Sequence, residues 1–219
     1  MSKVIVIGGH GKVALLAAPK LVAAGHEVTS VFRNPEHSDE VAATGATPKV
    51  ADVETMDVPD LAELLAGHDM VVWSAGAGGG NPARTYAVDR DAAIRSMEAA
   101  EQAGVPGYVM VSYLGAGPDH GVPQDNPFFH YAEAKTAADA ALRRSSLAWT
   151  ILMPSTLTTE PSQGTVTVGA TSPGDTSREL VADVITAVVG CEAGALAGVD
   201  IPFTDGDVPV AEALAGLAR

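Results

Sequence analysis

The chain has 219 residues, 47% of them hydrophobic, and its 13 basic and 27 acidic side chains give a formal net charge of -14 at pH 7. This length and apolar content predict one globular domain with a full core and exclude disordered and collagen-like proteins. The acidic balance argues against a nucleic acid or an anionic membrane as partner, because neutralising phosphate groups requires a basic surface.

The sequence offers little sign of a disulfide, a signal peptide or a membrane span. A single cysteine, Cys191, cannot form an internal disulfide. The apolar run near the N-terminus gives way to glycine too soon for the core of a signal peptide. No apolar stretch reaches the length of about 18 residues that a membrane span requires. We therefore expect a cytoplasmic monomer or homodimer that acts on a small molecule.

Short apolar runs alternate with alanine-rich stretches of helical pattern along the chain. Apolar residues on both faces of such runs are typical of buried parallel strands. The predicted strands are Val4–Ile7, Val28–Phe32, Pro48–Ala51, Met70–Trp73, Tyr108–Val111 and Trp149–Leu152. The predicted helices cover residues 12–24, 38–44, 59–66, 83–103, 130–145 and 179–190. This alternation predicts right-handed βαβ units and a doubly wound parallel α/β sheet, the Rossmann fold, in a single domain over residues 1–219.

The regular alternation fails in two segments, residues 114–129 and 155–178. Both follow strand ends on the side where sheets of this kind bind ligands. We expect them to be irregular loops that form a small substrate-side lobe.

A glycine-rich turn connects the first strand to the first helix. Its spacing Gly9-x-Gly11-x-x-Ala14 matches the dinucleotide-binding pattern, and Gly8 supplies a shifted variant of it. Glycine permits a tight turn and close approach of a pyrophosphate, while the helix N-terminus offers free N–H groups. The residues expected to contact the cofactor are Gly8, Gly9, His10, Gly11, Lys12 and Val13, although a solvent-facing His10 is an equally good interpretation.

The end of the second strand indicates which dinucleotide is bound. NAD sites usually carry an acidic residue there, whereas this chain has Arg33 and Asn34, with no carboxylate beside them in the sequence. Because a guanidinium fits a 2′-phosphate, we predict NADP(H) in preference to NAD(H). The alternative is that Arg33 is only a solvated surface residue.

The ends of the third and fourth strands are expected to border the adenine and the ribose. The residues concerned are Asp52, Val53, Ala75 and Gly76. Asp52 could equally cap a loop.

Tyr131 and Lys135 are spaced by four residues at the start of a predicted helix, which places them on one face. An ammonium group near a phenol favours the phenolate and would lower its pKa from about 10 towards a value useful for proton transfer. Such a pair alone is a weak signal of catalysis. Its position after the fifth predicted strand, with Ser112 at the end of that strand, makes the signal stronger.

These motifs together resemble the short-chain dehydrogenase/reductase superfamily, and most of all its atypical, NmrA-like NAD(P)-binding group. The resemblance spans nearly the whole chain, through Gly8–Ala14, Arg33–Pro35, Tyr108–Ser112, Tyr131–Lys135, Trp149–Pro154, Ser177–Val184 and Phe203–Gly206. It departs from the group at two points. Ser112-Tyr113 stands where two serines are common, and Met153-Pro154-Ser155 stands where Arg-Pro-Gly is common.

The resemblance implies an NAD(P)-dependent oxidoreductase that passes a hydride between the nicotinamide and a small carbonyl, quinone or enone. Tyr131 would act as acid/base, Lys135 would bind the ribose and tune the tyrosine, and Ser112 would polarise the substrate oxygen. The backbone of Pro154, Ser155 and Thr156 would meet the nicotinamide carboxamide.

Two alternatives remain open from the sequence. One is a non-catalytic protein that senses the dinucleotide, as members of the group without the Tyr/Lys pair do. The other is a sugar-nucleotide epimerase or dehydratase, which would need a larger C-terminal lobe. Four histidines, His26, His37, His68 and His120, are scattered along the chain without a cysteine or carboxylate at ligand spacing, so we expect no metal site.

Overall fold

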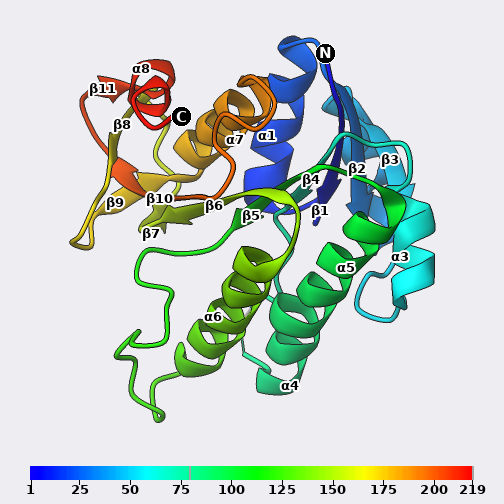
Figure 1. Ribbon diagram of the computed structural model, residues 1–219, viewed down its shortest axis with the longest axis horizontal. Coiled ribbons are helices and arrows are strands. Elements are labelled where there is room, and N and C mark those ends of the chain that lie inside the picture. The colour runs from blue at the N-terminus through cyan, green and yellow to red at the C-terminus, as the bar shows by residue number, and fades with distance from the viewer. Residues whose placement is uncertain (79, 219) are drawn as a thin grey trace.

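A computed structural model describes residues 1–78 and 80–218, and Gly79 and Arg219 lie outside the described residues. A mostly parallel nine-stranded sheet runs through the molecule in the order β11-β8-β10-β6-β5-β4-β1-β2-β3, with helices on both faces (Figure 1). The expected single-domain α/β fold with a doubly wound sheet is confirmed.

The six predicted strands are all present, with ends shifted by at most two residues. They are β1 (Lys3–Ile7), β2 (Glu27–Phe32), β3 (Thr47–Val50), β4 (Met70–Trp73), β5 (Gly107–Val111) and β6 (Ala148–Pro154). Ile7 of β1 is level with Val31 of β2 and Trp73 of β4, so neighbouring strands end at the same edge of the sheet. The strand order reverses between β1 and β4, and ligands bind beside such a reversal in open α/β sheets.

The predicted helices are also confirmed. Five of them are α1 (Lys12–Ala23), α2 (Ser38–Ala43), α3 (Val58–Leu65), α6 (Phe129–Arg144) and α7 (Arg178–Gly190). The sixth, predicted over residues 83–103, is a continuous run of α4 (Pro82–Thr85), the π-helix η2 (Tyr86–Ala92) and α5 (Ala93–Ala103). Another short helix, η1 (Pro35–His37), follows β2. A π-helical turn inside an α-helix often accompanies a functional site.

The prediction of an irregular loop over residues 155–178 is wrong. This segment contains β7 (Thr156–Thr158), β8 (Thr165–Val168) and β9 (Asp175–Ser177), and the chain ends with β10 (Val199–Asp205), β11 (Val208–Pro209) and α8 (Val210–Ala215). Strands β7 and β9 form a separate two-stranded sheet, while β8 pairs antiparallel with β10 and β11. The expected lobe therefore has strands of its own. In contrast, residues 114–128 form only turns and bends, and this loop extends beyond the sheet near the start of α6 (Figure 1).

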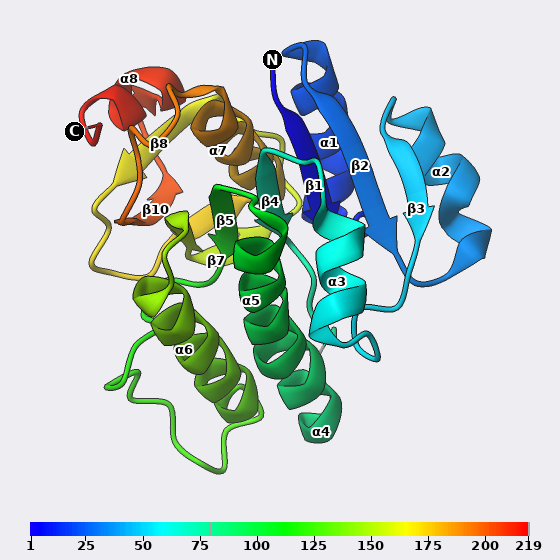
Figure 2. The same cartoon turned by 45° about the vertical axis from the view of Figure 1, so that its right-hand side comes forward.

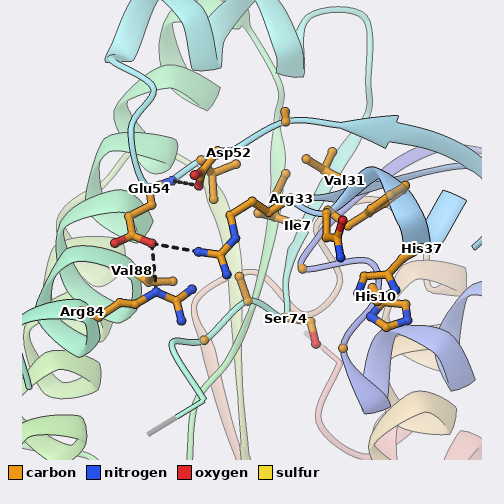
Figure 3. A pocket seen from close by; sticks show the side chains of 18 residues that line it. Ile7, His10, Val31, Arg33, His37, Asp52, Glu54, Ser74, Arg84 and Val88 are labelled. Atoms are coloured by element: carbon orange, nitrogen blue, oxygen red, sulfur yellow. Dashed lines mark hydrogen bonds and ion pairs between the residues drawn. The ribbon is translucent and has the colours of Figure 1, made fainter. Parts of the chain in front are cut away.

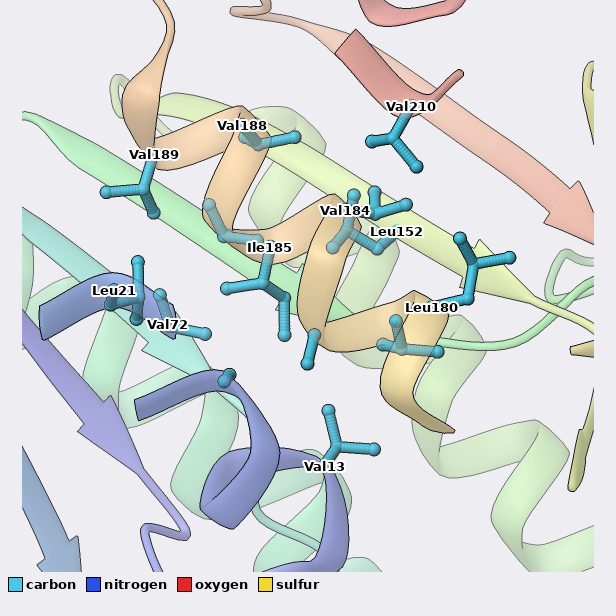
Figure 4. Packing of buried hydrophobic residues seen from close by; sticks show 14 of the residues in the cluster. Val13, Leu21, Val72, Leu152, Leu180, Val184, Ile185, Val188, Val189 and Val210 are labelled. Carbon is cyan, nitrogen blue, oxygen red and sulfur yellow. The ribbon is translucent and has the colours of Figure 1, made fainter. Parts of the chain in front are cut away.

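The core has two layers, one on each face of the sheet. Helices α1 and α7 cover one face, and α3, α5 and α6 cover the other (Figures 1 and 2). Leu21 of α1 lies opposite Ile185 of α7 across a tightly packed interface (Figure 4), and both side chains are fully buried. Each such side chain contributes about 1.5–3 kcal/mol to folding through its burial.

Among the described residues, no helix combines the length and the apolar character that spanning a membrane would require.

Candidate functional site

The glycine-rich turn is held closely against two strands. The N–H groups of Gly8 and Gly9 both donate to the carbonyl oxygen of Val31, at 3.0 and 2.7 Å, and the N–H of Gly11 donates back to the Gly8 carbonyl at 2.7 Å. Gly11 is also the N-cap of α1, where no side chain satisfies the first N–H groups of the helix. The turn thus leaves backbone donors and the positive end of a helix dipole available to an anion.

Gly8 has a structural reason to be glycine. Its φ is +88°, and a Cβ there would lie 2.6 Å from Cα and N of Ala75. Gly25 has the same φ of +88° but no atom within 4 Å of its Cβ position.

We expect Gly8→Ala to destabilise the protein clearly more than Gly25→Ala. A left-handed alanine costs about 1–2 kcal/mol at either position. Overpacking against Ala75 should add about 1–3 kcal/mol at Gly8. Urea denaturation of the two variants measures the difference, and equal losses of unfolding free energy would contradict this account of the turn.

A first cavity of about 300 Å³ opens beside the turn, at the carboxyl edge of β1 to β4. Most of the cofactor residues predicted from the sequence line it, namely Gly8, His10, Gly11, Arg33, Asn34, Asp52, Val53, Ala75 and Gly76. The other lining residues are Ile7, Val31, Phe32, His37, Ala51, Glu54, Ser74, Arg84 and Val88. Gly9, Lys12 and Val13 do not line it, because Gly9 and Val13 are buried against the sheet and Lys12 is exposed outside the cavity.

Arg33 does have a carboxylate beside it, contrary to the interpretation of the sequence. Glu54 Oε2 lies 3.6 Å from Arg33 Nη1 and 3.1 Å from Arg84 Nε, so one carboxylate joins two guanidinium groups (Figure 3). Glu54 follows β3 and Arg84 belongs to α4, which is why sequence proximity could not reveal the contact. The Arg33 side chain remains 55% exposed and therefore accessible to a ligand.

Two further predicted residues are engaged in local turns. The Asn34 side chain accepts from the Glu36 N–H and caps η1. Asp52 Oδ1 accepts from the Glu54 N–H at 3.2 Å, so the loop-cap interpretation of Asp52 is the one that the structure shows. Both residues still line the first cavity.

His37 is not isolated from the other histidines, contrary to the expectation from the sequence. His10 and His37 stack with ring centroids 3.5 Å apart and planes within 4°, and His10 Nε2 lies 2.7 Å from Glu40 Oε2. The three side chains bring possible ligand atoms within 4.8 Å of one another. Parallel rings at this spacing cannot both point a nitrogen at one ion in their planes, so the arrangement is a stacked pair of rings hydrogen-bonded to Glu40 beside the turn.

A second cavity of about 480 Å³ lies further along the same edge of the sheet, beside the ends of β5 and β6. It contains Ser112 and Tyr131, and its other lining residues are Tyr113, Leu114, Phe128, Pro154, Ser155, Thr156, Leu157 and Pro173. The rings of Tyr113, Phe128 and Tyr131 lie 5.1–5.7 Å from one another. The cavity is thus largely apolar and aromatic, with two hydroxyl groups of catalytic type.

The expected backbone contact from Pro154, Ser155 and Thr156 to a carboxamide needs correction. The Ser155 N–H donates to Thr176 Oγ1 at 3.1 Å, and the Thr156 N–H donates to the Gly174 carbonyl at 3.0 Å. These donors are used because the segment continues into β7 and pairs with β9, and is not a loop. The backbone N–H groups of Ser155 and Thr156 are therefore not available to a carboxamide, and only groups outside these hydrogen bonds can contact a ligand.

The expected lowering of the Tyr131 pKa by Lys135 is also wrong. Burial raises the pKa of the Tyr131 phenol, and the nearby carboxyl groups of Asp89 and Asp139 act in the same direction. Lys135 is 1% exposed and its Nζ lies 2.9 Å from Met110 Sδ. Burial lowers the pKa of this ammonium group. Tyr131 is therefore protonated at neutral pH, which is the form that can donate to a substrate oxygen.

Buried carboxyl groups beneath the second cavity were missed entirely. Asp139 lies one helical turn after Lys135, and its Oδ2 forms a 2.5 Å hydrogen bond with Ser112 Oγ. Asp89 of η2 accepts from the Ala77 N–H at 3.0 Å and thereby fixes the segment after β4. Spacing could have identified Asp139, since positions 131, 135 and 139 share one helix face; no sequence signal marked Asp89.

Comparisons with known proteins agree with this geometry. A family model described as NAD(P)H-binding matches residues 8–192. The Bacillus subtilis protein YhfK, named as an uncharacterized sugar epimerase, is 32% identical over 220 residues, which cover 97% of this chain and 98% of YhfK. A Bacillus halodurans structure, named for the NAD-dependent epimerases/dehydratases, is 33% identical with a TM-score of 0.90, over 99% of this chain and 100% of that one. A Veillonella parvula short-chain dehydrogenase/reductase in complex with NADP shares the fold, with 17% identity and a TM-score of 0.72 over 95% of this chain and 99% of that one.

Proposed function

Since the chain belongs to the NAD(P)H-binding family, we propose that it is an NADP(H)-dependent oxidoreductase that transfers a hydride between the nicotinamide and a small carbonyl, quinone or enone. The resemblance to atypical short-chain dehydrogenases/reductases is confirmed. The observation that carries the proposal is the alignment of two cavities along one sheet edge. The first has a phosphate-type turn, and the second has Tyr131 and Ser112 on its wall.

The preference for NADP(H) is supported by the first cavity. Arg33 and Arg84 approach the same point from two elements, and in the structure that point is taken by the carboxylate of Glu54 (Figure 3). A phosphate is a stronger acceptor for guanidinium groups than a ribose hydroxyl, and it can accept from both arginines at once. The 2′-phosphate of NADP(H) fits these donors.

The bound dinucleotide would supply or accept the hydride, and the chain itself handles the proton. Tyr131, which is protonated at neutral pH, would donate a proton to the substrate oxygen. Ser112, beside it in the same cavity, would orient that oxygen. Proton transfer from a positioned side chain contributes about 100- to 10,000-fold to the rate of such reactions.

The lining of the second cavity supports an uncharged, flat acceptor. Three aromatic rings and several apolar side chains bound it, and its lining among the described residues includes no lysine or arginine. A nucleoside diphosphate would require such cations, which weakens the epimerase alternative despite the names of the relatives. A quinone or an aromatic carbonyl matches both the surface and the volume.

Fluorescence titration with NADPH and NADH, followed by a turnover panel of quinones, aromatic aldehydes and enones, tests the proposal. We expect tighter binding of NADPH and oxidation of NADPH with at least one apolar acceptor. Tight binding without turnover across the panel would instead support the dinucleotide-sensing alternative. Equal affinities for the two cofactors would contradict the NADP(H) preference.

Removal of the Glu54 charge should strengthen NADPH binding. Glu54 occupies the two guanidinium groups in the free protein and must yield them to a phosphate. An exposed ion pair contributes about 0.2–1 kcal/mol, so Glu54→Gln should lower the Kd for NADPH by up to about fivefold. The Kd for NADH should stay the same. Calorimetric titration measures both, with the exposed Glu63→Gln of α3 as the matched control; weaker NADPH binding in Glu54→Gln would show that Glu54 assists the cofactor.

A further inference from the structure

Three ionisable side chains form a buried cluster behind Gly76 of the first cavity and Ser112 of the second. Asp89 comes from η2, while Lys135 and Asp139 come from successive turns of α6, and none is more than 1% exposed. Two carboxyl groups therefore share a single ammonium group away from water. A buried charge without enough partners is costly, so this arrangement favours a proton on one of the two carboxyl groups.

The hydrogen bonds distinguish the two carboxyl groups. Asp89 accepts from the backbone N–H of Ala77 and faces the cations Lys135 and Arg84. Asp139 bonds to Ser112 through Oδ2, and its Oδ1 is buried without a hydrogen-bond partner in the part of the chain that the structure describes. Both oxygens of an ionised carboxylate are acceptors, and leaving one buried without a donor costs more free energy when the group is charged. Asp139 is therefore the carboxyl group better suited to hold the proton.

The other charges around Asp139 do not change this assignment. Ser112 faces it from directly after β5, Lys135 and Arg143 face it from α6, and Asp200 faces it from β10. The phenols of Tyr113 and Tyr131 also lie near it and are uncharged when protonated. The positive charge of Lys135 is shared with Asp89. Arg143 and Asp200 form an ion pair with each other, and their effects on the pKa of Asp139 are opposite in direction. Burial raises the pKa of Asp139 as it does that of Asp89, so the hydrogen bonds are what distinguish the two carboxyl groups.

The state of Asp139 decides where the Ser112 hydrogen points. Ser112 has one hydroxyl hydrogen and two lone pairs. If Asp139 is ionised, that hydrogen is bound to Asp139 and only lone pairs face the cavity, where they repel a substrate oxygen. If Asp139 is neutral, its own O–H can donate to Ser112 Oγ, and the Ser112 hydrogen is free to donate into the cavity.

We propose that Asp139 is a positioning residue that acts as a neutral carboxylic acid, donating its hydrogen bond to Ser112 so that the Ser112 hydroxyl donates to the substrate oxygen. This inference rests on the proposed function, because it requires a substrate oxygen beside Tyr131. Asp139 keeps its proton throughout, and Tyr131 supplies the proton that the product gains.

Three variants test the proposal by turnover. Asp139→Ala removes the donor and should lower kcat by about 10- to 100-fold, less than the roughly 100- to 1,000-fold of a lost oxyanion donor, because Ser112 itself remains. Asp139→Asn, whose amide can donate to Ser112, should retain most of kcat at neutral pH. The double variant Ser112→Ala/Asp139→Ala should be no slower than Ser112→Ala alone, because Asp139 acts only through Ser112.

The pH profile gives a readout that a merely structural role would not change. As the pH rises through the raised pKa of Asp139, the wild type loses the neutral acid and its kcat should fall. Asp139→Asn cannot ionise, so this fall should be absent. An Asp139→Asn variant that is as slow as Asp139→Ala, or that keeps the alkaline fall, would overturn the proposal, as would additive effects in the double variant.

Infrared difference spectroscopy tests the protonation state without turnover. The carbonyl stretch of a buried protonated carboxyl group should be present in the wild type and absent in Asp139→Asn. A wild type without this band, or a band that persists in Asp139→Asn, would overturn the proposal. If the band follows Asp139 but the wild type turns over no acceptor, the proton assignment holds and the proposed function fails. The wild type and Asp139→Asn keep the test decisive even if Asp139→Ala does not fold.

Discussion

Replacement of Tyr131 by phenylalanine should lower kcat for NADPH oxidation by about 100- to 10,000-fold, the contribution of a well-placed general acid. The substitution removes only the hydroxyl group, and the aromatic contacts with Tyr113 and Phe128 can persist. The affinity for NADPH should change little, because Tyr131 lines the second cavity and not the first. Steady-state kinetics with the best acceptor of the panel, together with a cofactor titration, measures both effects.

Tyr86→Phe provides the matched control for this experiment. The Tyr86 hydroxyl lies 3.1 Å from His130 Nδ1, close to the start of α6 but outside the lining of the second cavity. Its loss should leave kcat within a small factor of the wild-type value. Full turnover by Tyr131→Phe would remove Tyr131 from the proposed mechanism.

Arg33→Gln should raise the Kd for NADPH by about 10- to 100-fold, since a charge-assisted hydrogen bond contributes about 1.5–3 kcal/mol. The Kd for NADH, which has no 2′-phosphate, should hardly change. Arg33 follows β2 at the mouth of the first cavity, where more than half of its side chain is exposed. Isothermal titration with the two cofactors measures the selectivity directly.

Arg144→Gln controls for the loss of a positive charge from an acidic protein. Arg144 is exposed at the end of α6 and does not line the first cavity. It should leave the Kd of both cofactors unchanged at physiological salt, because charges beyond a Debye length of about 8 Å are screened. An equal loss of NADPH and NADH affinity in Arg33→Gln would show that Arg33 contacts a part that both cofactors share.

The parallel part of the fold could be predicted because its signals are local. Strand Met70–Trp73 is an apolar run of four residues that ends at polar and glycine positions, and the structure has the same bounds. Strands β7 to β9 were missed because Thr, Ser, Gly and Pro dominate residues 155–178, and such residues equally suit a loop. Their pairing depends on β10 and on each other, which is tertiary information.

The candidate site, like the fold, could be predicted where its signals are local in the sequence. Tyr131 and Ser112 meet in one cavity, as their positions after the fifth strand indicated, and Arg33 lines the other cavity. What the sequence could not show was the partner of each group. Glu54 reaches Arg33 from the loop after β3, and Asp139 binds Ser112 across 27 residues. The second contact alters the expected chemistry because it occupies the Ser112 hydroxyl. Burial of Tyr131 alters it as well, because it raises the pKa that Lys135 was expected to lower.

The packing of α1 on α7 has a consequence for biosynthesis. Helix α1 carries the phosphate turn at its start, yet its buried face is covered by a helix that begins at Arg178. Lys20 of α1 is also tied to Glu179 and Asp183 of α7 by ion pairs of 3.2 and 2.7 Å. On the ribosome, the face of α1 that packs on α7 gains this partner only after residues 178–190 have emerged, since contacts distant in sequence close last. We therefore expect the packing of the dinucleotide-binding half to be completed late in synthesis.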